Sequence, residues 1–271
     1  KYNNYNMGGI TFIKNYGRLC NVIFRSIPVS IIAENQDLKV EYDPKYYNSI
    51  KNELGLNLYS GSINPEPFKK LVLKESTFEN VYKTSKKEKI NLHQVNCFMQ
   101  DEPCASYTFN FLRRDDNKKR TIEYNPFKNR YKSNNDIYIH IRWGDVSGRN
   151  PGYDYYLESI KRIKNFDNIY ISSDTKNNVI IEKLKKTYPK IKTLDTLNDI
   201  KTIQFGSTCK HVILSHGSYS AIIGYLSFFS DVYFCDVPNN YWCPMGMLKN
   251  KGFNGVIVKS ATDKFNEMKK K

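Results

Sequence analysis

The second half of the chain alternates short apolar strands with helical segments, and this alternation limits what the sequence can fold into. Strands are predicted at 137–142, 168–172, 211–215 and 232–235, and helices between them at about 153–165, 176–187 and 219–229. The strand segments are rich in Ile, Val and Tyr and are bounded by Gly, Asn and Ser, as strands usually are. Strands that alternate with helices form parallel sheets. The sequence therefore predicts a Rossmann-like α/β domain.

The first half of the chain carries similar elements with less regular spacing. Strands are predicted at 10–13, 38–42 and 92–99, and helices at about 19–31 and 46–54. Pro28 lies inside the first of these helices and is predicted to kink or split it. We expect its first turn, with Arg18 and Asn21, to offer outward-facing N–H groups that favour an anion.

Residues 113–135 separate the two halves and are unusually polar and charged. We interpret this stretch as a solvated linker; contact of its basic and aromatic residues with nucleic acid is the alternative. The sequence therefore predicts two domains, an N-terminal α/β domain at 1–130 and a C-terminal Rossmann-like domain at 131–271.

The charge balance of the chain is strongly basic. Its 42 Lys and Arg outnumber its 27 Asp and Glu, which gives a formal net charge of +15. A basic balance favours anionic partners, whether nucleotides, nucleic acid, acidic glycans or a membrane surface. No window of 18 uncharged apolar residues occurs, so we expect no transmembrane helix. The expected localisation is cytoplasmic, with an anchor upstream of residue 1 as the alternative, and the oligomeric state stays open.

The six cysteines and four histidines do not form a metal-binding pattern. No C-x-x-C pair occurs, and the histidines do not group with the cysteines. A structural zinc site is therefore not expected. Two pairs, Cys97–Cys104 and Cys235–Cys243, are close enough in sequence for disulfides, although a chain of this size does not need them.

The strand at 137–142 places chemistry-bearing side chains at its end. His140 and Arg142 share one face by the period of two, and Gly144 and Asp145 follow directly. Ligands of open α/β sheets bind at the carboxyl ends of the strands, which favours a binding role for this group. An edge strand with a solvated arginine and a turn aspartate is the alternative.

Two further predicted strands also end in polar residues. Ser173 and Asp174 follow the second strand, and the sequence HGSYS at 216–220 opens the helix after the third. A Gly-Ser turn at a helix start can hold a phosphate or cap the helix. The G-x-G-x-x-G and Walker patterns are missing, which argues against a dinucleotide dehydrogenase and a P-loop NTPase. Three polar strand ends in one parallel sheet favour a nucleotide site of another kind.

Three motifs resemble those of a known family. HIRWGD at 140–145 resembles the H-x-R-x-G-D motif of the α-1,2-fucosyltransferases of glycosyltransferase family 11, and more loosely the H-x-R motif of α-1,6- and protein O-fucosyltransferases. GRLCN at 17–21 resembles the first motif of those families, and CKHVILSHGSYS at 209–220 resembles the late one. The motifs occur in the family's order.

The match also has departures. Trp143 stands where the family usually has a second Arg, Cys20 and Val22 stand where it usually has Gly and Gln, and 221–223 replace its aromatic pair. The family's Asp before the late motif has no residue in register, and Asp199 is the nearest.

The resemblance implies a GT-B-like enzyme with two Rossmann-like domains and parallel sheets. Such an enzyme is an inverting, metal-independent glycosyltransferase that moves L-fucose from GDP-fucose to a glycan hydroxyl. The C-terminal domain would hold the donor, the N-terminal domain would face the acceptor, and no further cofactor or specific nucleic acid is implied. The chain has no D-x-D pattern, which metal-dependent transferases use to hold an ion on the diphosphate.

The same resemblance suggests roles for individual residues. We expect Arg142 to bind the leaving diphosphate, and Asp145 to be either the general base or the residue that orients Arg142. The expected donor-binding residues are His140, Arg142, Asn21, Arg18, Asp174, Gly217, Ser218, Tyr219 and Ser220, of which His140 and Asp174 are assigned to the nucleoside. Two alternatives stay open: the same fold with another nucleotide sugar, such as a UDP-linked hexose or pentose, and a basic nucleic-acid-binding protein.

Overall fold

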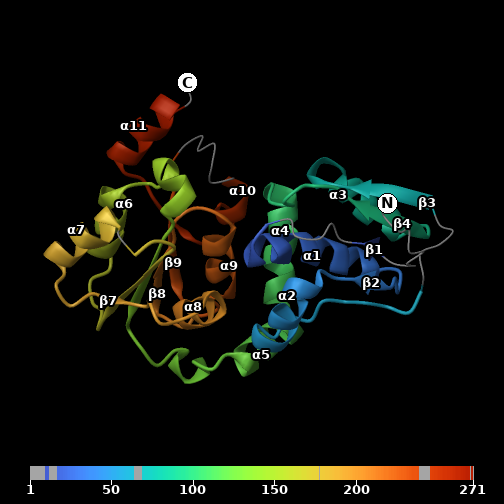
Figure 1. Ribbon diagram of the computed structural model, residues 1–271, viewed down its shortest axis with the longest axis horizontal. Helices are drawn as coiled ribbons and strands as arrows, with labels where there is room; N and C mark the ends of the chain where they lie inside the picture. Colours follow the sequence, from blue (N-terminus) through green and yellow to red (C-terminus); the bar gives the residue numbers. More distant parts are fainter. Residues whose placement is uncertain are drawn as a thin grey trace. The chain divides into compact units, whose positions relative to one another are not determined.

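The computed structural model describes residues 10–11, 17–63, 69–176, 178–237, 245–268 and 270 (Figure 1). The chain divides into two compact units, unit 1 at 1–117 and unit 2 at 118–271. The sequence placed this boundary at 130/131, within the same polar stretch.

Unit 1 is an α/β unit with parallel strand pairs. Its elements are β1 (Ile10–Thr11), α1 (Leu19–Glu34), β2 (Val40–Glu41), α2 (Pro44–Asn48), a π-helix (Ser49–Glu53), β3 (Lys69–Leu73), a 3₁₀ turn (Glu75–Thr77), α3 (Phe78–Ser85), β4 (Ile90–Gln94) and α4 (Glu102–Arg113). β1 pairs with β2 and β3 pairs with β4, both in parallel.

Helix α1 is the central helix of unit 1. It is apolar on almost every side and nearly all of it is buried, as expected for a helix that is packed all round. Pro28 lies inside it, yet the α-helix continues from Leu19 to Glu34, so the prediction of a split is wrong. Cys97 and Cys104 are separate thiols and do not form the disulfide that their spacing would permit.

Unit 2 contains the predicted alternation of strands and helices. Its elements are α5 (Asp115–Tyr124), a 3₁₀ turn (Lys128–Arg130), β5 (Ile137–Ile141), a 3₁₀ segment (Gly144–Arg149), α6 (Tyr153–Lys161), β6 (Ile169–Ser173), α7 (Val179–Thr187), β7 (Lys192–Thr193), α8 (Asp199–Gly206), β8 (His211–Ile213), α9 (Ser218–Leu226), β9 (Asp231–Cys235), α10 (Met245–Leu248), β10 (Asn254–Val256) and α11 (Lys259–Met268). Helix α5 begins just before the boundary between the units.

The strands of unit 2 form one parallel sheet in the order β10-β9-β8-β5-β6-β7. Counted from β5 as strand 1, this is the 3-2-1-4-5-6 order of doubly wound nucleotide-binding folds. The predicted class, α/β with parallel sheets, is confirmed. The strand order reverses between β5 and β8, and this switch point is where such folds bind ligands.

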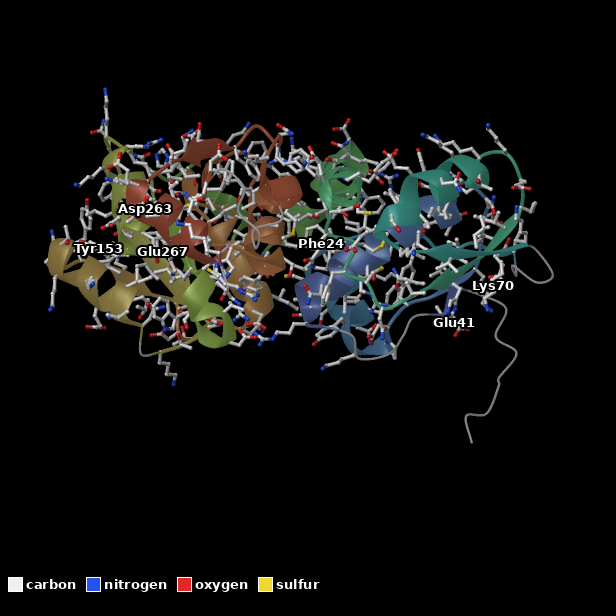
Figure 2. The ribbon with its side chains drawn as sticks, turned by 90° about the horizontal axis from the view of Figure 1, so that it is seen from above. Phe24, Glu41, Lys70, Tyr153, Asp263 and Glu267 are labelled. Atoms are coloured by element: carbon white, nitrogen blue, oxygen red, sulfur yellow. The ribbon has the colours of Figure 1, made fainter. Side chains whose placement is uncertain are left out.

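Both faces of β5 are buried, so it is an internal strand rather than the edge strand of the alternative. Its isoleucines pack in a cluster with residues of α6 and α7. Tyr138 and His140 point to the opposite face. There Gly206 of α8 lies against the ring of Tyr138, and Ser220 of α9 contacts His140. Helix α11 lies beside α6, as the labels of Asp263 and Tyr153 show (Figure 2).

Residues 113–135 are folded rather than a solvated linker, which corrects the sequence-based interpretation. Asn125 is buried and its amide donates to the carbonyl of Gln204 and the hydroxyl of Tyr131, both at 3.0 Å. Arg130 pairs with the buried Asp136 at 2.6 Å. Asn125 and Arg130 make these specific hydrogen bonds within unit 2, which composition alone does not reveal. Among the described helices, none combines the length and apolar character that crossing a bilayer requires.

Candidate functional site

The candidate site lies at the carboxyl edge of the unit 2 sheet, around the switch point between β5 and β8. The chain leaves β5 into the segment at 142–152 and leaves β8 into the turn that starts α9. Asp174 follows β6, the other neighbour of β5. The three polar strand ends found in the sequence therefore meet at one edge of one sheet.

Arg142 is held between two carboxylates. Its guanidinium forms ion pairs with Asp145, three residues ahead, and with Asp174. Asp174 also accepts a hydrogen bond from the backbone N–H of Trp143 at 2.7 Å, which anchors this carboxylate to the start of the loop. The Asp145 side chain is 61% exposed and that of Arg142 is 17% exposed. A guanidinium carries five N–H donors, so it can contact carboxylates and a ligand's oxygens together.

Gly144 permits this arrangement because a side chain there would collide with Asp174. A Cβ at position 144 would lie 2.5 Å from Oδ2 of Asp174 and 3.3 Å from its Cγ. A turn directly after a strand is one reason for glycine at position 144. The structure adds the close approach of a carboxylate as a second reason for glycine here.

His140 lies under the start of α9. Its ring is 4% exposed, and Nδ1 lies 2.6 Å from Oγ of Ser220. The ring of Tyr219 packs on it, with 4.9 Å between centroids. Burial, with the nearby charges of His216 and Arg142, lowers the pKa of His140 to about 3, so its imidazole is neutral near pH 7. These contacts tie the first turn of α9 to β5.

Helix α9 begins at Ser218, and the residue before it, Gly217, occupies the cap position. Gly217 is the N-cap, with φ of 90°, and no side chain caps the helix there. The predicted capping role of Ser218 is therefore wrong: the chain needs a left-handed backbone at the cap, which glycine supplies, and Ser218 is the first helical residue. Tyr219 donates its hydroxyl hydrogen to the carbonyl of Asp199 at 2.7 Å.

A buried asparagine that the sequence analysis missed organises the segment after β5. Asn150 is fully buried, and its amide nitrogen donates to the carbonyl of Arg142 at 2.8 Å and to the hydroxyl of Tyr156 at 2.9 Å. Nζ of Lys264, from α11, donates to the carbonyl of Asn150 at 2.7 Å. The sequence offers only an Asn-Pro-Gly turn signal here. Arg142 and Tyr156 are near Asn150 in the sequence, whereas Lys264 is 114 positions away.

Two predicted site residues belong to unit 1. Arg18 is the exposed N-cap residue of α1, and Asn21 lies on the first turn of that helix. The amide nitrogen of Gln100 donates to Oδ1 of Asn21 at 2.9 Å. Gly17 has φ of 92°, and a Cβ there would lie 2.7 Å from the Cβ of Asn21. The helix start that the first motif predicts is therefore present.

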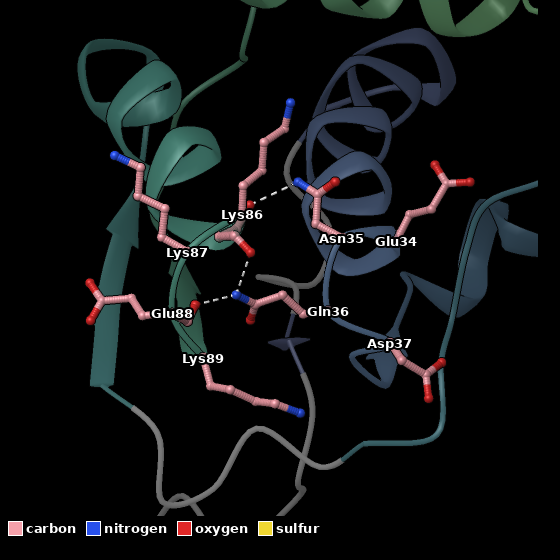
Figure 3. Close-up of a pocket in the computed structure, with 9 residues that line it drawn as sticks. Glu34, Asn35, Gln36, Asp37, Lys86, Lys87, Glu88 and Lys89 are labelled. Carbon is pink, nitrogen blue, oxygen red and sulfur yellow. Dashed lines mark hydrogen bonds between the residues drawn. The ribbon is translucent and has the colours of Figure 1, made fainter.

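Unit 1 also has an open hollow of about 420 Å³ between the end of α1 and the turn from α3 to β4 (Figure 3). Lysines and acidic residues both line it. The amide nitrogen of Gln36 donates to the carbonyls of Ser85, at 2.7 Å, and of Glu88, and its Oε1 accepts from the N–H of Ile90 at 3.1 Å. These bonds join α1 to the start of β4, so this side chain has a structural role.

Comparison with known proteins identifies similar structures and no family. No protein family model and no curated protein sequence matches the chain. The structure is similar to E. coli heptosyltransferase WaaC with ADP, at 8% identity and a TM-score of 0.49, over 95% of this chain and 97% of that one. It is also similar to E. coli heptosyltransferase WaaC with ADP-2-deoxy-2-fluoro heptose, at 9% identity and a TM-score of 0.47, over 95% of this chain and 96% of that one.

Proposed function

We propose that this protein is an inverting, metal-independent glycosyltransferase that moves L-fucose from GDP-fucose to a glycan hydroxyl. The observation that carries the proposal is the position of Arg142. This residue follows β5, which borders the switch point of a sheet with nucleotide-binding strand order, and its guanidinium pairs with Asp174 after β6. The fucosyl donor is inferred from the three motifs that resemble fucosyltransferases.

The proposed reaction is a displacement at the anomeric carbon. The acceptor hydroxyl oxygen forms a bond to that carbon from the face opposite the diphosphate, and the bond from carbon to the diphosphate oxygen breaks. The electron pair goes to the diphosphate, and the acceptor proton goes to a general base. Negative charge therefore grows on the β-phosphate, where donors that are already in place stabilise the transition state.

In this proposal the chain's own groups hold the diphosphate. Arg142 supplies the positive charge, and the N–H groups of the first turn of α9 supply further donors. Asp174 and Asp145 orient the guanidinium, and Asp145, the more exposed of the two, is the candidate base. His140 positions Ser220 and Tyr219.

A screen of sugar nucleotides tests the proposal. The purified protein is incubated with GDP-fucose, other GDP-sugars, UDP-sugars and ADP-sugars, and release of the nucleoside diphosphate is measured with and without glycan acceptors. We expect turnover with GDP-fucose. Turnover with a UDP-linked sugar alone would retain a glycosyltransferase and remove the fucosyl assignment.

Chelation is expected to leave the transfer rate unchanged. Arg142 and the start of α9 take the place of a divalent ion on the diphosphate in our proposal. The measurement is the rate in EDTA against the rate with Mn²⁺ or Mg²⁺. Loss of activity in EDTA that either ion restores would show that the diphosphate chemistry has been misassigned.

Replacing Gly144 with alanine is expected to weaken GDP binding and slow transfer by about a hundredfold. The new Cβ would displace the Asp174 carboxylate, and a shift of about 1 Å at a reacting site costs rate on that scale. Gly148 in the same loop is the matched control, because a Cβ there meets nothing within 4 Å. Equal activity of Gly144→Ala and Gly148→Ala would mean that the position of Asp174 does not matter.

A further inference from the structure

His216 is a buried side chain at the switch point with an unused polar atom. It follows β8 directly and precedes Gly217, the N-cap of α9. The residue is 5% exposed, and its Nε2 has no hydrogen-bond partner within the described residues. A buried donor or acceptor without a partner costs free energy and is rare in folded proteins. A ligand at this edge would supply the missing partner.

The hydrogen bonds behind the ring favour one position for the proton of the imidazole. The hydroxyl of Tyr156 donates to Oγ of Ser215 at 2.9 Å, and the amide nitrogen of Asn150 donates to the same oxygen at 3.4 Å. The Ser215 hydroxyl hydrogen is then directed to Nδ1 of His216, 3.4 Å away. Nδ1 is the acceptor in this chain of bonds, so a neutral imidazole carries its proton on Nε2.

The charges around the ring favour an anion and not a proton. Burial, with the positive charges of Arg142, Lys264 and Arg149, lowers the pKa of His216 to about 4, and Asp145 opposes that shift. The imidazole is therefore neutral near pH 7. The ring therefore offers a neutral N–H donor in a field to which Arg142, Lys264 and Arg149 add positive charge and Asp145 adds negative charge. Such a donor suits an oxyanion.

We infer that the Nε2–H of His216 donates a hydrogen bond directly to a diphosphate oxygen of the bound nucleotide. The inference rests on the proposed function for the identity of the ligand. It adds to the diphosphate site a neutral donor beside Arg142, contributed by the turn after β8. It also explains the buried hydrogen bonds of Asn150, Tyr156 and Ser215, because they favour one tautomer of this imidazole.

Nuclear magnetic resonance of the full chain labelled with ¹⁵N-histidine tests the inference directly, with inorganic pyrophosphate as the probe. We expect His216 to carry its proton on Nε2 at pH 7, its ring signals to move on addition of pyrophosphate, and its pKa to rise in the complex. His211, mostly buried at the opposite end of β8 beside Asp231, is the internal control, and its signals are expected not to move. A proton on Nδ1, or signals that pyrophosphate leaves in place while it binds, would overturn the inference.

Two substitutions add a binding measurement. His216→Phe removes the donor and is expected to weaken pyrophosphate binding by about tenfold to a hundredfold, as expected for a hydrogen bond to a charged group. His216→Gln keeps an N–H donor near Nε2 and is expected to recover much of the affinity, while His211→Gln leaves it unchanged. Equal affinity of the Phe and Gln variants would overturn the role of the donor.

The outcomes also separate this inference from the proposed function. Pyrophosphate binding that depends on His216, in a protein that turns over no sugar nucleotide, would support the anion site and contradict glycosyl transfer. Turnover of GDP-fucose at the same rate in the His216→Phe protein would support glycosyl transfer and contradict the inference. Absence of pyrophosphate binding by the unsubstituted protein would contradict the inference.

Discussion

Replacing Arg142 with alanine is expected to lower the rate of sugar transfer by roughly 10²–10³, the usual cost of removing one preorganised donor group. The residue lies at the carboxyl end of the central strand, where Asp145 and Asp174 fix its guanidinium. A group fixed in this way needs no rearrangement as charge develops on the diphosphate. Its removal therefore raises mainly the free energy of the transition state. The measurement is the transfer rate at saturating donor.

Replacing Arg142 with lysine is expected to be nearly as damaging. Lysine keeps the charge but loses the planar fork that can contact two oxygens at once. An ammonium also cannot hold both carboxylates in their present orientation. Both variants are expected to stay folded, because Asp174 keeps its bond to the N–H of Trp143 and Asp145 is largely exposed.

The control for these variants is Arg162→Ala, on the surface of α6. Arg162 is 41% exposed and pairs with Glu158 at 3.5 Å, so its removal is expected to leave the rate unchanged. A melting curve of each variant shows whether it is folded. An Arg142→Lys protein with more than about a third of the original rate, against the expected hundredfold loss, would place the site elsewhere. Unfolding of both Arg142 variants would make this residue structural.

Acid is expected to destabilise the protein before its carboxylates titrate. His140 and His216 are buried and neutral, with pKa values of about 3 and about 4 in the folded chain. In the unfolded chain each has a pKa of about 6.5. Above pH 6.5 the two imidazoles are unprotonated in both the folded and the unfolded chain. Between pH 6.5 and about 4 the imidazoles take up protons only in the unfolded chain. The free energy of unfolding therefore falls as the pH drops toward 4.

The two histidines together are expected to lower the free energy of unfolding by about 4 kcal/mol between pH 7 and pH 5. Urea unfolding at several pH values measures this. His216→Gln has one fewer buried imidazole and is expected to lose about half of the pH dependence. A free energy of unfolding that stays level from pH 7 to pH 5 would show that the two rings are charged or solvated in the native protein.

The sequence predicted β5, β6, β8 and β9 and the helices α6, α7 and α9 because their signals are local, but it did not predict β7, β10, α8, α10 and α11. The alternation of Ile137, Ile139 and Ile141 and the polar residues after three strands identified the strands and the edge of the sheet that matters. The order of the strands is not a local property. The central place of β5, which determines that Arg142 lies at the switch point, depends on pairing with β6 and β8.

The parts that the sequence missed depend on contacts between distant residues. Lys264 and Asn150 are 114 positions apart, and their hydrogen bond has no signature in either neighbourhood. In the sequence His216 is one residue of a predicted turn. Only the structure shows that it is buried and that its Nε2 has no hydrogen-bond partner within the described residues. Pro28 was predicted to kink or split α1, and the helix is not split because tertiary packing overrides this local preference along a helix that is buried on nearly every side.

Calorimetric titration of GDP into the protein in EDTA, compared with UDP, ADP and CMP and repeated with Arg142→Ala, tests the central claim most directly. The claim is that the carboxyl edge of the unit 2 sheet binds a nucleoside diphosphate through Arg142. The account predicts that GDP binds best without a metal, and that Arg142→Ala weakens this binding by at least about tenfold, the loss of a charge-assisted hydrogen bond. Absence of nucleotide binding, or GDP binding of equal strength in the Arg142→Ala protein, would contradict it.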